Sequence, residues 1–129
     1  MSEVMFTARV PSGSVNPQGA RDIGPDEAVS PTVQRLRERF PQAVQAVSEF
    51  RGDYTVTLRP ADLAPVATFL RDDPELRFQH LSDLTSQDRL KYPDRQPGDP
   101  RFVAVYHLLA PDRGERLRLK VPAPGGDNP

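Results

Sequence analysis

The sequence contains no cysteine. A chain without thiolates forms no disulfide, cannot hold an iron–sulfur cluster through its own sulfur atoms and cannot use thiol catalysis. Long apolar runs are also missing: no stretch approaches the roughly 20 residues that a membrane-spanning helix needs, and the N-terminus shows no basic segment followed by an apolar one. We therefore expect a soluble protein that is not itself exported and does not insert directly into a membrane.

Excess charge of either sign is missing too. The 17 basic and 18 acidic residues give a formal net charge of -1, so no overall field would attract nucleic acid or an anionic membrane. Apolar residues make up only 36% of the 129 positions and there are 15 prolines, so part of the chain is expected to stay outside any packed core. The length suits one compact domain that recognises its partners locally.

The distribution of Gly, Pro, Ser, Asn and Asp divides the chain into three parts. Residues 1–29 are rich in these types and show no apolar period, which predicts a disordered N-terminal arm. Periodic apolar residues occupy positions 30–122, where we expect the folded domain. Residues 123–129 carry no core residue and are expected to form a flexible tail or a truncated linker.

Two helices are expected in the folded part. Ser30 is a favoured N-cap and Pro31 suits the first helical position, because the N–H that proline lacks would be unbonded there. This first helix should end before Pro41. Asp62 can cap a second helix, which should close near Pro74.

Five strands are expected. The first two, 44–50 and 54–59, are separated by Arg51-Gly52-Asp53 and are predicted to form a hairpin. The other three are 78–88, 102–109 and 116–121. Because 102–109 is apolar at both parities, we expect it to be a central strand covered on both faces.

The order helix, two strands, helix, three strands predicts the fold class. We expect an α+β domain of two layers, α-β(2)-α-β(3), with a mixed sheet and both helices on one face. The sequence shows no internal repeat, no heptad run and no glycine loop of the kind that binds nucleotides.

Few residues are candidates for chemistry. His80 and His107 are the two histidines and could hold a metal with nearby aspartates, but the ligand set is incomplete, so histidines with a hydrogen-bonded ring nitrogen are favoured. Asp83 and Asp88 flank Ser82 and could form a carboxylate pair or a nucleophile site. Such residues also bond locally to the backbone at strand ends, which is the favoured interpretation. We therefore assign no catalytic, cofactor-binding or metal residue, and a small hydrolase using Asp83 or His80 remains a minor alternative.

Two features are candidates for partner contact. Arg116, Arg118 and Lys120 alternate with apolar residues and form a basic stripe, which could meet phosphates or an acidic partner. The stripe could equally be a solvated strand face that discourages edge aggregation. Tyr92 lies in the long loop 91–101, where an exposed aromatic residue could contact a partner or the loop could merely connect two strands. The residues thus favour a binding or scaffold module over an enzyme.

Several linked segments resemble one known family. They are the run 69–78, the residues His80-Leu81-Ser82-Asp83-Leu84-Thr85 with Asp88, the loop 90–93, the strand 102–109 and the run 116–122. In order and spacing they are similar to the thirty-kilodalton subunit of NADH:quinone oxidoreductase, which is respiratory complex I. The resemblance covers about residues 31–122, and the fold that it implies agrees with the one expected from the residue pattern.

The resemblance implies a structural role without catalysis. Members of the family belong to the peripheral arm of a membrane-bound enzyme that passes electrons from NADH to quinone and moves protons. The implied subunit holds no redox centre and no cofactor, and it helps to hold the neighbouring quinone-site subunit beside the iron–sulfur subunits. It would lie on the cytoplasmic side of the plasma membrane through the complex. The alternative is a free-standing α+β adaptor or protein-interaction module of unrelated function.

One family signature does not occur in these residues. It is a Glu-Arg-Glu stretch that leads to an Asp-Met-Phe-Gly-Ile-type segment and a Gly-His-Pro-Asp-Leu run. We expect either that the sequence is a fragment cut at a domain boundary or that the remainder belongs to another chain. In the family this segment makes much of the contact with the quinone-site subunit, so we expect this chain alone to bind that partner weakly or not at all.

Overall fold

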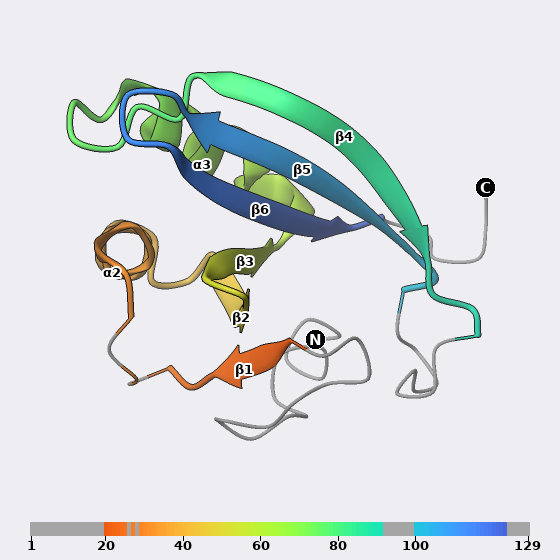
Figure 1. Cartoon of the computed structure of the whole chain (residues 1–129). Coiled ribbons are helices and arrows are strands. Elements are labelled where there is room, and N and C mark those ends of the chain that lie inside the picture. Colours follow the sequence, from red (N-terminus) through yellow and green to blue (C-terminus); the bar gives the residue numbers. More distant parts are fainter. Residues whose placement is uncertain (1–19, 26, 28, 92–99, 124–129) are drawn as a thin grey trace.

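A six-stranded sheet carries the structure (Figure 1). The computed structural model describes residues 20–25, 27, 29–91 and 100–123. Their elements, in chain order, are β1 (Arg21–Ile23), α2 (Pro31–Arg39), β2 (Val44–Phe50), β3 (Asp53–Leu58), the 3-10 turn η1 (Pro60–Asp62), α3 (Leu63–Asp72), β4 (His80–Asp88), β5 (Phe102–Ala110) and β6 (Glu115–Pro122). The strand order across the sheet is β1-β2-β3-β6-β5-β4. The pair β3 and β6 is parallel and the other neighbours are antiparallel, so the sheet is mixed.

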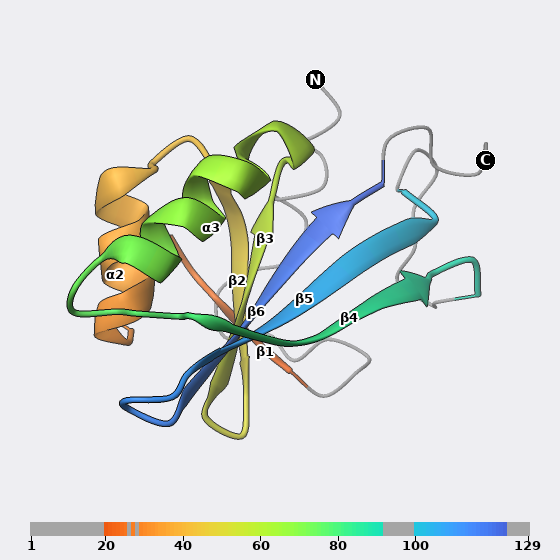
Figure 2. The same ribbon diagram turned by 90° about the horizontal axis from the view of Figure 1, so that it is seen from above.

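The predicted α+β fold is confirmed. Both helices lie on the same side of the sheet (Figure 2). They share one hydrophobic core with it, to which α2 contributes Leu36, α3 contributes Leu70 and β6 contributes Leu119, each at most 1% exposed. Burial of these side chains against the sheet is the main stabilising contribution, because apolar area removed from water dominates folding.

The first helix begins and ends as predicted. The Oγ of Ser30 accepts a hydrogen bond from the N–H of Val33 at 3.3 Å, and Pro31 occupies the first turn. The N–H of Phe40 donates to the carbonyl of Leu36 at 2.8 Å, just before Pro41. Local sequence signals therefore fix both ends of α2.

The second helix begins differently from the prediction. A 3-10 turn, η1, precedes it, and Asp62 already has helical backbone angles with no capping bond from its side chain. Because the backbone at Asp62 is helical, its carboxylate lies outside the position of a cap and instead accepts a hydrogen bond from Nε of Arg59 at 2.6 Å. The prediction of a helix here is confirmed, whereas the prediction that Asp62 caps it is wrong.

The hairpin between β2 and β3 is confirmed. Arg51 and Gly52 both have positive φ angles, 53° and 87°, as the two central residues of a type I′ turn require. Phe50 and Asp53 close the turn as a register pair. Gly52 is the residue that makes this turn accessible, since φ above zero strains other side chains.

The sheet has one strand that sequence analysis did not expect. Residues 21–23 fall within the segment 1–29, for which we expected a disordered arm, yet they form β1, which pairs with β2. The expectation is wrong for these three residues, because a segment so short shows no apolar period even though Ile23 is buried. The rest of the expected arm, residues 1–19, and most of the expected tail, residues 124–129, lie outside the described residues.

The place of β5 also corrects a prediction. This strand lies between β6 and the edge strand β4, not at the centre of the sheet. Val103 and Val105 are buried, but Tyr106 and Leu108 are only partly so, and the strand is therefore not covered along both faces. The reason is the parallel pairing of β3 with β6, which puts β6 in the interior and leaves β5 next to the edge.

Candidate interaction surfaces

The predicted basic stripe lies on the face of the sheet opposite the core. Leu117 and Leu119 of β6 are buried in the core, so the alternating side chains Arg116, Arg118 and Lys120 leave the other face of the strand. The stripe crosses the middle of the sheet, because β6 has β3 on one side and β5 on the other. The alternative that these charges protect a sheet edge is therefore excluded.

The charge of the stripe is partly balanced at one position. Arg118 lies opposite Thr55 on β3 and His107 on β5, and its Nη2 is 3.9 Å from Oδ2 of Asp53. At this distance in partly exposed surroundings the pair contributes little to stability. Arg116 is exposed at one end of the stripe. The stripe can thus present positive charge to a partner without being needed for the fold.

The other predicted contact residue, Tyr92, lies outside the described residues. The base of its loop is described: the N–H of Arg89 donates to the carbonyl of Arg101 at 2.6 Å. The Nε and Nη2 atoms of Arg101 each donate to the carboxylate of Asp88 at 2.9 Å, and its guanidinium lies 4.7 Å from the ring centre of Phe102. These contacts hold the two ends of the loop together.

Sequence analysis missed the most exposed part of the sheet. Strand β4 is exposed at every position except Gln87, and Leu81 and Leu84 are 51% and 53% exposed. In register they lie opposite Leu108 and Tyr106 of β5. The apolar surface of the sheet therefore continues outward onto an edge strand, which is a recurrent feature of protein–protein contact sites.

A β-bulge explains why this surface was missed. The register between β4 and β5 shifts between Leu81 and Asp83, so two leucines three positions apart lie on one face. The Oγ of Ser82 donates to the carbonyl of His107 at 2.9 Å, and a carboxylate oxygen of Asp83 accepts from the N–H of Leu84 at 2.9 Å. Strict alternation fails here, and only an expectation of a bulge could have revealed the apolar face.

The candidate chemical residues are used for local structure. Ser82 and Asp83 bond to the backbone, as the favoured interpretation predicted, and Asp88 pairs with Arg101. His80 lies exposed at the start of β4, whereas His107 is half-buried in β5 opposite Asp83. Within the described ranges no group of three or more His, Cys, Asp or Glu side chains could hold a metal ion. The structure brings no catalytic constellation together among these residues.

Neither helix resembles a membrane span. No helix in the described part of the chain is long and apolar enough to cross a bilayer.

The fold and its surfaces thus define an α+β domain whose distinctive features are suited to binding. A sequence profile described as "Respiratory-chain NADH dehydrogenase, 30 Kd subunit" matches residues 56–129. The chain belongs to this family.

Relatives from three bacteria agree with this assignment, and each is named as one and the same subunit of NADH-quinone oxidoreductase. The protein of Roseiflexus sp. (strain RS-1) is 45% identical over 89 residues, which are 69% of this chain and 48% of the relative. The protein of Roseiflexus castenholzii is 46% identical over 93 residues, 71% of this chain and 50% of the relative. That of Burkholderia multivorans is 45% identical over 86 residues, 67% of this chain and 43% of the relative. The chain spans about half the length of the curated relatives that it matches.

Proposed function

We propose that the chain forms part of a structural subunit of the proton-translocating NADH:quinone oxidoreductase. The observation that carries this proposal is the family match, which runs from β3 through β6 and so includes the whole β4–β5–β6 half of the sheet. The three bacterial relatives support it over about two thirds of the chain. The chain would belong to the peripheral arm, on the cytoplasmic side of the plasma membrane.

The role within this complex is to hold other subunits in place. A sheet with one face buried under two helices is a rigid support, and electron transfer requires cofactors at fixed separations. We propose that the domain helps to position the quinone-site subunit beside the iron–sulfur subunits. The domain would carry no redox centre of its own, which the absence of cysteine supports for these 129 residues.

Two surfaces are proposed as contacts. The edge strand β4 offers the half-exposed side chains of Leu81 and Leu84, and removing such apolar area from water favours association. The basic stripe of Arg116, Arg118 and Lys120, together with Tyr92, would contribute at the rim. Rim charges act mainly on the rate and specificity of association.

Affinity purification tests the proposed function against the adaptor alternative. The tagged full-length protein is expressed in its own host, and the proteins that co-purify from solubilised membranes are identified by mass spectrometry. The proposal predicts that the quinone-site subunit and iron–sulfur subunits co-purify with it in constant ratio. A free-standing adaptor would instead purify without respiratory subunits, and this result would overturn the proposal.

The role of β4 is tested by a paired substitution. Leu81→Asp with Leu84→Asp places charge on the exposed apolar surface and should prevent co-purification, while the thermal midpoint of the isolated chain changes little because both side chains are half-exposed. The matched control is Phe50→Asp, an exposed apolar residue at the distant β2–β3 hairpin. If the paired variant assembles as well as the control, β4 is not the contact.

A further inference from the structure

The strand β1 is held to the sheet differently from the other strands. It has three residues, lies at the edge and pairs only with β2. Ile23, at 7% exposure, is the single buried side chain of this strand. Strand β6, by comparison, buries Leu117, Leu119 and Val121. Hydrophobic burial therefore contributes much less to the attachment of β1.

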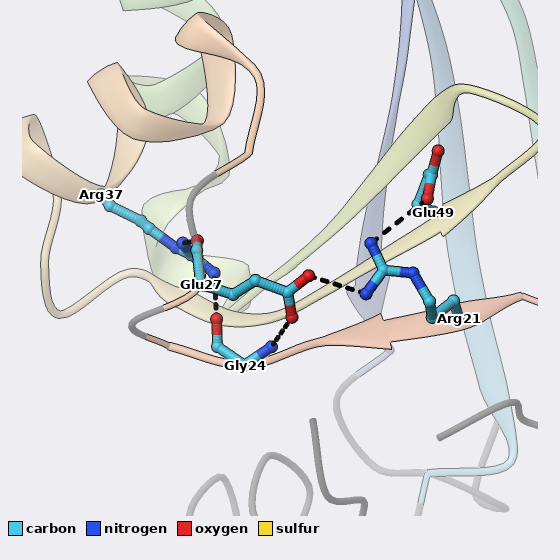
Figure 3. Close-up of polar contacts among 5 residues, drawn as sticks. All are labelled: Arg21, Gly24, Glu27, Arg37 and Glu49. Atoms are coloured by element: carbon cyan, nitrogen blue, oxygen red, sulfur yellow. Dashed lines mark hydrogen bonds and ion pairs between the residues drawn. The ribbon is translucent and has the colours of Figure 1, made fainter. Parts of the chain in front are cut away.

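Charged side chains supply further contacts to β1 (Figure 3). Nη1 of Arg21 donates to Oε2 of Glu27 at 2.7 Å, and Nη2 of Arg21 lies 3.5 Å from Oε1 of Glu49 on β2. The other carboxylate oxygen of Glu27 accepts from the N–H of Gly24 at 3.4 Å. The hydrogen bond to Glu27 also raises the pKa of the Arg21 guanidinium. One carboxylate thus joins the side chain of β1 to the turn that follows it.

A second cation fixes the same turn from the helix layer. Arg37, in the last turn of α2, donates through Nη2 to the carbonyl of Gly24 at 2.7 Å and through Nη1 to the carbonyl of Glu27 at 2.8 Å. A planar guanidinium can hold two carbonyls at once, which an ammonium group cannot do with the same geometry. We call Arg21, Gly24, Glu27, Arg37 and Glu49 the polar clasp.

The clasp lies where solvent reaches it. The side chains of Arg21, Glu27 and Glu49 are 40%, 30% and 28% exposed. Ion pairs with this exposure are weakened by salt, whereas a buried apolar contact is not. An edge segment held mainly by such contacts opens at a lower free energy than the core strands and can do so separately.

From these contacts we propose that β1 is a releasable strap, closed by the polar clasp and opened by loss of the Glu27 charge without unfolding of the rest of the domain. Opening frees the backbone of β2 from Val47 to Glu49, the register partners of β1. The sheet would then have a second unpaired edge, on the side opposite β4. An unpaired strand edge can accept another strand, so the strap would control access to this edge.

Residue-resolved amide hydrogen exchange of the whole chain tests the strap. In the unmodified protein the bonded amides of β1 should exchange through a local opening, faster than those of β6. Glu27→Gln keeps the size of the side chain and removes its charge, and it should speed exchange in β1 about three- to tenfold while β6 is unchanged. Arg37→Lys should act in the same direction, although it lies on α2, because it keeps the charge and loses the fork.

The matched control is Glu75→Gln. Glu75 pairs with Arg35 of α2 away from β1, so its change should leave exchange in β1 unaltered. Raised salt should reproduce the effect of Glu27→Gln in the unmodified protein and add little to it in the variant. The proposal is overturned if β1 and β6 exchange through the same opening, or if Glu27→Gln speeds exchange in both strands equally or in neither.

Discussion

Leu119 shows at the scale of one residue what holds the domain together. It lies on β6 between β3 and β5, its side chain is 1% exposed, and it belongs to the core that both helices share. Its register partners Val56 and Tyr106 extend the apolar surface across three strands. The interior strand of the sheet is therefore β6, and its leucines are the side chains on which stability should depend most.

Substitution at this position gives the first prediction. Leu119→Ala should lower the free energy of unfolding by about 2 to 5 kcal/mol, through lost transfer energy and the cavity that remains. Leu108→Ala on β5 should cost less, about 1 to 2 kcal/mol, because this side chain is partly exposed. Urea denaturation monitored by circular dichroism gives both values. Equal losses at the two positions would contradict the assignment of β6 as the interior strand.

At the scale of elements, the two helices begin in different ways. Ser30 caps α2 through its side chain, whereas Asp62 precedes α3 with a helical backbone and a carboxylate that pairs with Arg59. The two residues are alike in being favoured caps in sequence, and only one makes the capping bond. A short polar residue before a helix is therefore insufficient by itself to predict a cap.

This difference can be measured. Ser30→Ala should lower the free energy of unfolding by about 1 kcal/mol, because an N–H at the start of α2 loses its partner. Asp62→Ala should cost less than about 0.5 kcal/mol, since it removes only a partly exposed ion pair. Thermal denaturation of the two variants side by side provides the comparison. A larger loss at Asp62 than at Ser30 would show that the capping assignments are reversed.

Features that depend on neighbours in the chain could be predicted from the sequence. The start of α2 at Pro31, its end before Pro41 and the turn at Gly52 each follow from a local residue preference. The strand order could not be predicted, because the parallel pairing of β3 with β6 joins segments about sixty residues apart and leaves no local pattern. The strand β1 was too short to show a period.

The candidate surfaces divide in the same way. Alternation alone was sufficient to place Arg116, Arg118 and Lys120 on one face of a strand. The exposure of Leu84 was not predictable, because it depends on the bulge near Asp83 and on the edge position of β4. Apolar residues in a strand were taken as core residues, and tertiary structure decided otherwise.

At the scale of the whole molecule, the domain has a buried side under the helices, an exposed edge at β4 and a basic stripe across its open face (Figures 1 and 2). Reversing the stripe with Arg116→Glu, Arg118→Glu and Lys120→Glu in the full-length protein should slow assembly and reduce its dependence on salt. The thermal midpoint should change little, because these side chains lie outside the core. Association measured across a salt series tests this, and rates that match the unmodified protein at every salt concentration would return the stripe to a solvated face.

The proposed role of this chain is structural service to NADH:quinone oxidoreductase. Deleting its gene in the host and measuring NADH:quinone oxidoreductase activity in isolated membranes tests that role most directly. We expect the activity and the assembled complex both to be lost, and a plasmid copy of the unmodified gene to restore them. Full activity in membranes of the deletion strain, with the complex assembled, would contradict this role.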